Sequence, residues 1–184
     1  RQALACKCDV TSQESVAALA AQVQKKFGRC DILINCAGIY PQQEFEQMKF
    51  EDWRRVLSIN LDSVFLVSAV FAPGMKQRGW GRVVNMCSLN GVNAHVGSLE
   101  YNAAKEALRA LTRTAAREWA PTGVTVNALC PAAKSQAFFR AIGEYPELEA
   151  MADAITERTR LVARSSVTFA ADGVGWPPMV VQGS

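Results

Sequence analysis

The chain has 184 residues, of which 49% are hydrophobic and 20% are charged, so its composition is that of an ordinary one-domain globular protein. Its net charge of +3 comes without a block of like charges, which argues against nucleic acid or a membrane surface as a partner. No apolar run approaches the ~18 residues that a membrane span needs, and we see no secretory signal, so we expect a cytoplasmic protein. The six cysteines show no Cys-x-x-Cys spacing and no cluster with histidine, which predicts reduced thiols and no metal site.

Short strands alternate with helices along the first two thirds of the sequence. Apolar runs predict strands at 3–8, 31–35, 82–87 and 124–129. Apolar residues at helical spacing predict helices at 12–27, 51–77 and 101–120. Thr11 or Ser12 caps the first helix, Gly28 ends it, and Pro73-Gly74 is expected to disturb the last part of the second. The remainder predicts helices over 146–159 and 166–171 and a weak strand at 179–181.

Strands that alternate with helices predict a parallel sheet with right-handed crossovers. The continuous apolar strand at 31–35 is typical of a strand that is covered on both faces. Ligands of such sheets bind outside the carboxyl ends of the strands. Three predicted strand ends carry unusual residues, namely Asn35-Cys36-Ala37-Gly38, Ser88 and Pro131-Ala132. The helix with Tyr101 and Lys105 starts just beyond the second of these ends, so we expect the functional site at this edge.

Tyr101 and Lys105 are four residues apart and therefore share one face of their predicted helix. A nearby cation favours the phenolate and lowers the pKa of a tyrosine, which suits the pair to general acid–base catalysis. Ser88 offers a hydroxyl donor and acceptor at a strand end; the alternative is a turn or cap residue. Asn60 is polar on an apolar helix face and is either a structural amide or a group that holds water. His95 is interpreted as a solvated loop residue, with a substrate contact as the alternative.

The sequence resembles the short-chain dehydrogenase/reductase family in several motifs. The stretch Asp31-Ile-Leu-Ile-Asn-Cys-Ala-Gly38 resembles the family's Asn-Asn-Ala-Gly turn, with Cys36 in place of the second Asn. The segment 126–131 resembles the family's Val-Asn-x-x-x-Pro-Gly segment, with Ala132 in place of the Gly. The family's Asn-Ser-Tyr-Lys tetrad is matched in order and spacing by Asn60, Ser88, Tyr101 and Lys105.

The resemblance covers Asp9 to about Pro131 and implies both a fold and an activity. The fold is a Rossmann-like, doubly wound parallel sheet in three αβα layers, expected here as a single partial domain over 1–184. The activity is hydride transfer between NAD or NADP and a small-molecule alcohol or carbonyl substrate. The family also implies a homodimer or homotetramer through the helices near 51–77 and 101–120.

The resemblance implies a role for each tetrad residue. Tyr101 would give a proton to a carbonyl or remove one from an alcohol. Lys105 would lower the pKa of Tyr101 and hold the nicotinamide ribose. Ser88 would orient the substrate oxygen, and Asn60 would fix a water that relays protons from Lys105. The residues implied to bind the cofactor are Asp9, Val10, Asn35, Ala37, Gly38, Tyr101, Lys105, Pro131 and Ala132.

A departure from the family's pattern at the amino end suggests an alternative function. The family's glycine-rich Thr-Gly-x-x-x-Gly-x-Gly turn, which binds pyrophosphate, and its first two strands have no counterpart before the strand at 3–8. The chain begins with Arg1 rather than Met, so we expect an N-terminally truncated member of the family. The alternative to an enzyme is a catalytically inactive remnant that serves as a fold or oligomerisation module. Both the choice between NAD and NADP and the substrate stay open at this point.

Overall fold

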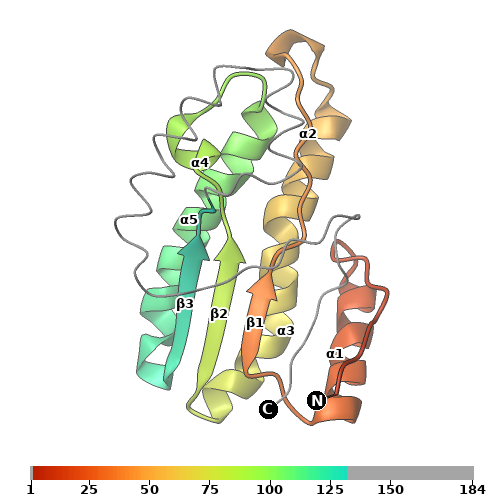
Figure 1. The fold of residues 1–184 in the computed structure, drawn as a ribbon, viewed down its shortest axis with the longest axis vertical. Helices are drawn as coiled ribbons and strands as arrows, with labels where there is room; N and C mark the ends of the chain where they lie inside the picture. Colours follow the sequence, from red (N-terminus) through yellow and green to blue (C-terminus); the bar gives the residue numbers. More distant parts are fainter. Residues whose placement is uncertain (1, 132–184) are drawn as a thin grey trace. The chain divides into compact units, whose positions relative to one another are not determined.

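The computed structural model describes residues 2–131 of the chain (Figure 1). Residues up to Cys130 belong to one compact unit, and Pro131 belongs to a second one. The elements predicted after 145 and the predicted cofactor contact Ala132 lie outside the described residues. A single domain over 1–184 stays a prediction.

Three parallel strands form the sheet, in the order β1 (Ile32–Asn35), β2 (Gly81–Met86) and β3 (Val124–Leu129). Their bounds confirm three of the predicted strands to within one residue at each end. Leu33 pairs with Val83 and Val83 pairs with Val126, so one row of apolar side chains crosses the sheet. All three residues are buried in the main hydrophobic core, which lies between the sheet and the helices. The parallel α/β arrangement is therefore the Rossmann-like one that the sequence predicts.

Helix α1 (Gln13–Phe27) has the ends that the sequence predicts. Ser12 is its N-cap, and the Ser12 hydroxyl accepts a hydrogen bond from the backbone N–H of Ser15 at 3.2 Å. Gly28 ends the helix in the left-handed conformation, with a φ of 74°, which glycine adopts without strain. The buried side of the helix is apolar and consists of Val16, Leu19 and Val23.

One continuous helical run follows the loop after β1, in the parts α2 (Phe50–Leu57), η2 (Ser58–Asp62) and α3 (Ser63–Gln77). The middle part is a π-helical turn, a feature that is frequent at functional sites. Within it, the side-chain amide of Asn60 donates to the carbonyl of Val56 at 3.1 Å. Pro73 does not disturb α3 as predicted, because the helix continues through it. A proline removes only one backbone donor, and the buried residues Phe71 and Met75 hold the helix on both sides of it.

The run Phe50–Gln77 is also more apolar than predicted. With 28 residues it is long and apolar enough to span a membrane, by length and composition alone. This finding corrects the expectation that no apolar run reaches that length. Core helices pass the same test, and α3 contributes Val67, Phe71 and Met75 to the core that it shares with the sheet.

A long helix, α5 (Leu99–Trp119), leads back from the carboxyl edge of the sheet toward the start of β3. The loop before it contains an unpredicted short helix, α4 (Asn90–Asn93), and two short 3-10 helices lie elsewhere, η1 (Phe45–Gln47) and η3 (Ala120–Thr122). Gly91 lets α4 approach α5 closely, because a Cβ there would lie 2.8 Å from the backbone nitrogen of Glu106. The position of α4 against α5 therefore depends on this glycine.

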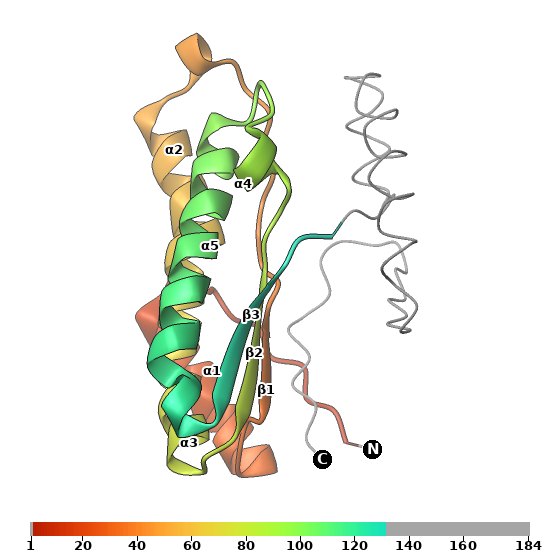
Figure 2. The same ribbon diagram turned by 90° about the vertical axis from the view of Figure 1, so that its left-hand side faces the viewer.

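The helices of the described part cover one face of the sheet, as the edge-on view in Figure 2 shows. The strand order means that both crossovers move in one direction, and right-handed crossovers then place their helices on the same face. Residues 2–131 thus supply two of the three predicted αβα layers, namely the sheet and one layer of helices. On the other face Ile32 and Ile34 are 49% and 48% exposed, which differs from the expectation that β1 is covered on both faces.

Residues 3–8 do not form the predicted strand. A strand needs a neighbour that accepts its backbone hydrogen bonds, and no strand of the described part pairs with this segment. The segment still packs its alternate residues Cys6 and Cys8 against the core. The Cys6 thiol donates to the side-chain oxygen of Gln22 at 3.3 Å, so the segment lies along α1.

Candidate functional site

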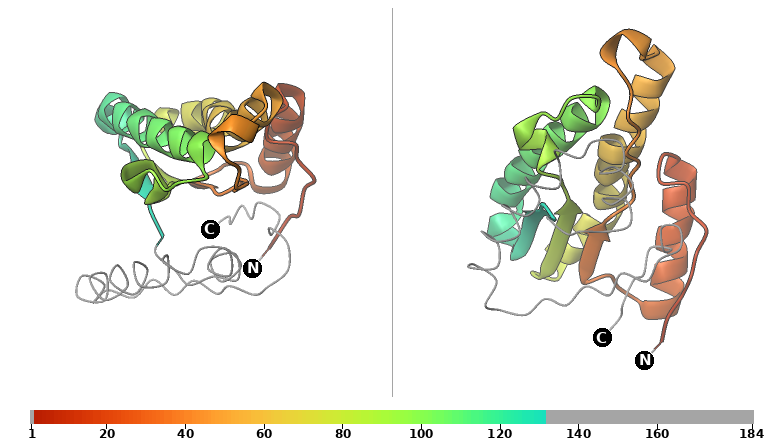
Figure 3. Two further views of the ribbon diagram at one scale, coloured as in Figure 1. Left: turned by 90° about the horizontal axis from the view of Figure 1, so that it is seen from above. Right: turned by 45° about the horizontal axis from the view of Figure 1, so that its top comes forward.

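The candidate site lies at the carboxyl edge of the sheet, where β1 and β2 end (Figure 3). Gly38 comes from the loop after β1, and Ser88 lies between β2 and α4. The start of α5 brings Tyr101 and Lys105 to the same edge, and the π-helical turn brings Asn60. Residues from four separate parts of the chain therefore meet there, as the sequence predicts for a parallel sheet.

Tyr101 and Lys105 lie one turn apart at the start of α5. The Lys105 ammonium lies 5.3 Å from the centre of the Tyr101 ring. It also donates a hydrogen bond to the carbonyl of Met86, at the end of β2, at 2.8 Å. Because Lys105 is only 5% exposed, this bond fixes the cation in place beside the phenol ring.

Burial is the largest influence on the pKa values of Tyr101 and Lys105. It raises the pKa of Tyr101 above its usual value, and the Ser88 hydroxyl opposes that shift with a smaller effect. Burial also lowers the pKa of Lys105, because an ammonium loses more from desolvation than a neutral amine does. The expected lowering of the Tyr101 pKa by Lys105 is not what the structure shows. The Lys105 ammonium is directed at the Met86 carbonyl instead of the phenol oxygen.

Ser88 is both a turn residue and a neighbour of the Tyr101 phenol, so the two interpretations of this serine are compatible. Its hydroxyl accepts from the backbone N–H of Asn90 at 3.2 Å and donates to the Asn90 side-chain oxygen, also at 3.2 Å. Asn90 therefore orients the serine hydroxyl. Sequence reasoning did not single out Asn90, and its position two residues after Ser88 was the available signal.

Asn60 is fully buried and joins the π-helical turn to the loop after β1. Its amide donates to the carbonyl of Ile39 at 3.0 Å as well as to that of Val56. Its Oδ1 atom has no hydrogen-bond partner among the described residues. A Cβ on Gly38 would lie 2.7 Å from this oxygen and 3.8 Å from the Lys105 nitrogen. Gly38, Asn60 and Lys105 therefore border one point, and a larger residue at 38 would collide with Asn60.

The residues of this edge fit the ribose side of the cofactor that the resemblance implies. The unpaired Asn60 oxygen, the Lys105 ammonium and the side-chain-free Gly38 offer an acceptor, a donor and a close backbone approach. Ala37 is exposed beside them. Further along, the carboxylate of Asp9 accepts from the N–H and the hydroxyl of Thr11 at 2.9 and 2.7 Å.

Those two bonds lower the pKa of Asp9 and keep it an acceptor at neutral pH. Val10, next to Asp9, is half-buried. Pro131, the remaining described cofactor candidate, belongs to the second unit.

Asn35 turns its side chain into the protein. Its amide donates to the Ser68 hydroxyl at 3.2 Å and to the Asn85 side-chain oxygen at 2.9 Å. Asn85 in turn donates to the Thr112 hydroxyl at 2.9 Å. This buried chain ties β1 and β2 to α3 and α5, and it engages the side-chain nitrogen of Asn35 within the protein. Asn85 was not predicted, although a polar residue in the middle of an apolar strand was the available sequence signal.

Two more side chains of the edge were not predicted. The ring of Tyr40, two residues after Gly38, packs against Tyr101 in an edge-to-face arrangement, with 4.7 Å between the ring centres. Ser98 is fully buried just before α5 and shares a hydrogen bond with the Tyr40 hydroxyl. His95, which the sequence did single out, is half-buried in the preceding loop, and its carbonyl accepts from the Asn102 amide at 2.7 Å.

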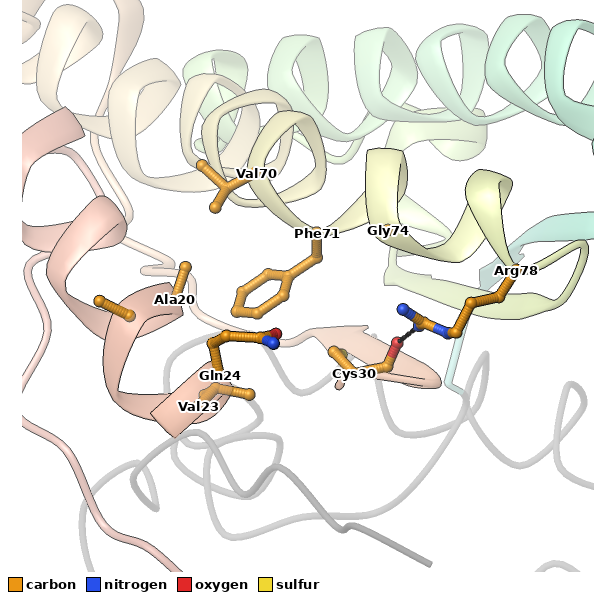
Figure 4. A pocket seen from close by; sticks show the side chains of 9 residues that line it. Ala20, Val23, Gln24, Cys30, Val70, Phe71, Gly74 and Arg78 are labelled. Atoms are coloured by element: carbon orange, nitrogen blue, oxygen red, sulfur yellow. Dashed lines mark hydrogen bonds between the residues drawn. The ribbon is translucent and has the colours of Figure 1, made fainter. Parts of the chain in front are cut away.

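A hollow of about 280 Å³ lies between α1 and α3 at the opposite end of the sheet (Figure 4). Arg78 closes one side of it by donating to the Cys30 carbonyl at 2.6 Å. Burial raises the pKa of the Cys30 thiol to about 11, so this lining group is neutral at physiological pH. None of the tetrad residues lines the hollow. Within residues 2–131 no group of three or more His, Cys, Asp or Glu side chains is arranged to hold a metal ion.

The chain is similar in sequence to known dehydrogenases and reductases. Residues 1–145 match the family model described as short chain dehydrogenase. Nodulation protein G of Azospirillum brasilense is 42% identical over 123 residues, which cover 67% of this chain and 50% of that protein. D-beta-hydroxybutyrate dehydrogenase of Rhizobium meliloti (strain 1021) is 40% identical over 123 residues, covering 67% and 48%. Acetoacetyl-CoA reductase of Allochromatium vinosum is 39% identical over 123 residues, covering 67% and 50%. The chain thus spans about half the length of the curated relatives it matches.

Proposed function

The chain belongs to the short-chain dehydrogenase/reductase family, and on that premise we propose that it interconverts an alcohol and a carbonyl compound, with Tyr101 as the general acid and base. Relatives in this family use NAD or NADP, which carries the hydride when it is bound. The observation that supports the proposal most is the meeting of Tyr101, Ser88 and Lys105 at the carboxyl edge of the sheet.

Each residue of the tetrad has a task in this proposal. Ser88 donates a hydrogen bond to the substrate oxygen, after exchanging its bond to Asn90 for one to the substrate. Tyr101 gives its phenol proton to that oxygen when the carbonyl is reduced and takes a proton from it when the alcohol is oxidised. Lys105 supplies the positive charge beside the ring and a donor for the ribose, and Asn60 offers its unpaired oxygen between Lys105 and Gly38.

The raised pKa of Tyr101 has a consequence for the direction of the reaction. A phenol with a pKa above its usual value is protonated at neutral pH, which is the form that a carbonyl reduction needs. Alcohol oxidation needs the phenolate, whose population grows as the pH rises. The proposal therefore gives reduction near neutral pH and oxidation at alkaline pH.

The substrate class follows from two relatives whose names state a substrate. D-beta-hydroxybutyrate carries a hydroxyl and acetoacetyl-CoA a carbonyl on the carbon beta to the acid or thioester group. We extend this to the present chain and propose a 3-hydroxyacyl or 3-oxoacyl compound. The loop around α4 supports that choice, because Val92 and Val96 are 54% and 81% exposed and offer an apolar surface to an acyl chain.

Replacing Tyr101 tests the proposal. NADH and NADPH are titrated against the full chain by nucleotide fluorescence, and acetoacetyl-CoA reduction is followed by nucleotide absorbance. Tyr101→Phe should lower kcat by about 10²- to 10⁴-fold, because the proton donor is gone, and should leave cofactor binding nearly unchanged. Glu106→Gln on the exposed side of α5 is the matched control and should change neither quantity.

Two outcomes would contradict the proposal. Turnover by Tyr101→Phe comparable to that of the unaltered chain would refute the role of Tyr101. No saturable binding of NADH or NADPH up to about millimolar concentration would instead favour a non-catalytic oligomerisation module, since binding at that level is weak by any standard.

The exposed Phe65 and Val70 of α3 favour this second candidate. They would pack against a second copy of the chain, together with α5, in a homodimer or homotetramer. A cytoplasmic location stays a prediction for either candidate.

A further inference from the structure

Tyr40 meets Tyr101 in a defined aromatic geometry. The two ring centres are 4.7 Å apart and the ring planes make an angle of 67°, so one ring presents its edge to the other. Edge-to-face pairs at this separation are favourable because the positive edge of one ring meets the negative face of the other. The contact joins residues that are far apart in the sequence, since one lies in the loop after β1 and the other in α5.

Tyr40 is itself held in place although it is 37% exposed. Its hydroxyl forms a 3.0 Å hydrogen bond with the hydroxyl of Ser98, which is fully buried directly before α5. The backbone N–H of Gln43 donates to the carbonyl of Gly97 at 2.9 Å, so a second bond joins the same two loops. Two hydrogen bonds therefore join the loop after β1 to the loop before α5, in addition to the ring contact.

A third hydrogen bond joins the loop after β1 to the π-helical turn. Asn60 donates to the carbonyl of Ile39, the residue directly before Tyr40, at 3.0 Å. Asn60 is fully buried and also bonded to Val56, so it is a rigid anchor. The placement of the Tyr40 ring thus depends on the same buried amide that borders Gly38 and Lys105.

From these contacts we propose that Tyr40 is a positioning residue for Tyr101. Its ring holds the Tyr101 ring beside Ser88 and Lys105 and excludes water from one part of the phenol. The effect on turnover rests on the proposed function, whereas the effect on the phenol itself does not. Tyr40 would thereby be a fifth member of the site, supplied by the loop after β1 and not by the tetrad.

The proposal is consistent with the protonation of Tyr101. Burial is the main cause of the raised pKa of that phenol, and Tyr40 makes a smaller electrostatic contribution in the same direction. Removing the Tyr40 ring would admit water to the Tyr101 phenol. Better hydration favours the phenolate, so it lowers the pKa of Tyr101.

The test is a spectrophotometric titration of the phenol in the full chain. The chain has three tyrosines, so Tyr145→Phe combined with a change at Tyr40 leaves Tyr101 as the only tyrosine. Tyr40→Phe keeps the aromatic ring at this position, and Tyr40→Ala removes it. We expect the tyrosinate absorbance of the alanine variant to rise at a midpoint about half a pH unit or more below that of the phenylalanine variant.

A matched control separates the Tyr40 ring from exposed aromatic residues in general. Phe45→Ala, added to the variant with Tyr40→Phe and Tyr145→Phe, removes a 68% exposed ring of the same loop and should leave the midpoint unchanged. Far-UV circular dichroism verifies that all variants fold. Equal midpoints for the phenylalanine and alanine variants, with the fold intact, would overturn the positioning role.

Kinetics then tests the catalytic consequence. With Tyr145 intact, Tyr40→Ala should lower kcat for acetoacetyl-CoA reduction about two- to tenfold and leave the dissociation constant of NADH unchanged, because Tyr40 acts through Tyr101. A chain that shows the titration difference without any turnover would disprove the proposed function and leave the positioning of the phenol standing. A chain that turns over with an unchanged kcat in Tyr40→Ala would overturn the catalytic part of the inference.

Discussion

Glu100 is a buried carboxyl group directly before Tyr101. It is fully buried, and neither of its carboxylate oxygens has a hydrogen-bond partner among the described residues. It lies on the inner face of α5 in line with Ala104 and Leu108, where an apolar residue would be expected. A carboxyl group in such a place costs stability, because it has lost its water without gaining a hydrogen-bond partner.

Replacing this carboxylate should therefore stabilise the chain. Glu100→Met keeps the length of the side chain and removes the charge, and we expect the free energy of unfolding to rise by about 1–3 kcal/mol in urea denaturation. Glu106→Met, on the exposed side of the same helix, should change it by less than about 0.5 kcal/mol, since it loses only a surface ion pair with Arg109. A loss of stability in Glu100→Met would mean that Glu100 has a partner outside residues 2–131.

At the residue scale, local spacing carried most of the information that the sequence held about the site. Tyr101 and Lys105 were recognisable because a helix repeats its faces every four residues, and Ser88 because it follows a strand. Tyr40 could not be found in this way. Its contacts with Tyr101 and Ser98 join residues about 60 positions apart, and no local pattern reports such a contact.

At the element scale, the packing of α4 on α5 determines the position of Ser88. A Cβ on Gly91 would lie 2.8 Å from the nitrogen of Glu106 and 2.9 Å from the carbonyl carbon of Lys105. Both are backbone atoms of a long helix, so α4 and not α5 would have to shift. The shift would carry Ser88 away from Tyr101, since Ser88 is bonded to the first residue of α4.

Gly91→Ala should accordingly lower the free energy of unfolding by about 1–3 kcal/mol, as overpacking does in other tight contacts. Gly74→Ala in α3 is the control, because its Cβ would meet only the flexible end of Arg78, at 3.2 Å. A helical glycine that becomes alanine stabilises by roughly 0.5–1 kcal/mol, so the two variants should move in opposite directions. Equal effects of both substitutions in thermal denaturation would contradict the close contact.

The elements themselves show where sequence patterns suffice and where they fail. α1 was predicted with both of its ends because Ser12 and Gly28 act locally. The strand at 3–8 was wrong, since a strand exists only where another strand accepts its hydrogen bonds, and its own residues do not tell where that partner lies. The π-helical turn at Asn60 was missed for a similar reason, because the bond to Ile39 that accompanies it comes from another segment.

At the scale of the whole molecule, the described sheet has one covered and one open face. Leu33 is buried under the helices, whereas Ile32 and Ile34 on either side of it are about half exposed on the other face. The alternation follows from the pleat of a strand, and the one-sided cover follows from the common direction of the two crossovers. The apolar run 31–35 alone suggested two covered faces, because a sequence pattern does not distinguish a covered face from an open one.

Because of this asymmetry, β1 has a buried apolar residue, Leu33, and two half-exposed ones, Ile32 and Ile34. Leu33→Ala should lower the free energy of unfolding by about 2–5 kcal/mol, because it leaves a cavity in the core. The double change Ile32→Thr and Ile34→Thr should lower it by less than about 1 kcal/mol, since both residues stay half in water and threonine suits a strand as well. The measurement is urea unfolding followed by circular dichroism at one protein concentration.

The comparison also decides whether another layer covers the open face in solution. If a second copy or another part of the protein packs on Ile32 and Ile34, the threonine variant loses as much stability as Leu33→Ala, and the loss depends on protein concentration when the cover is a second copy. A small and concentration-independent change would mean that residues 2–131 fold around a single covered face. In that case the candidate site rests on a two-layer frame, and the helices on the covered face alone hold Tyr101, Lys105 and Asn60 in place.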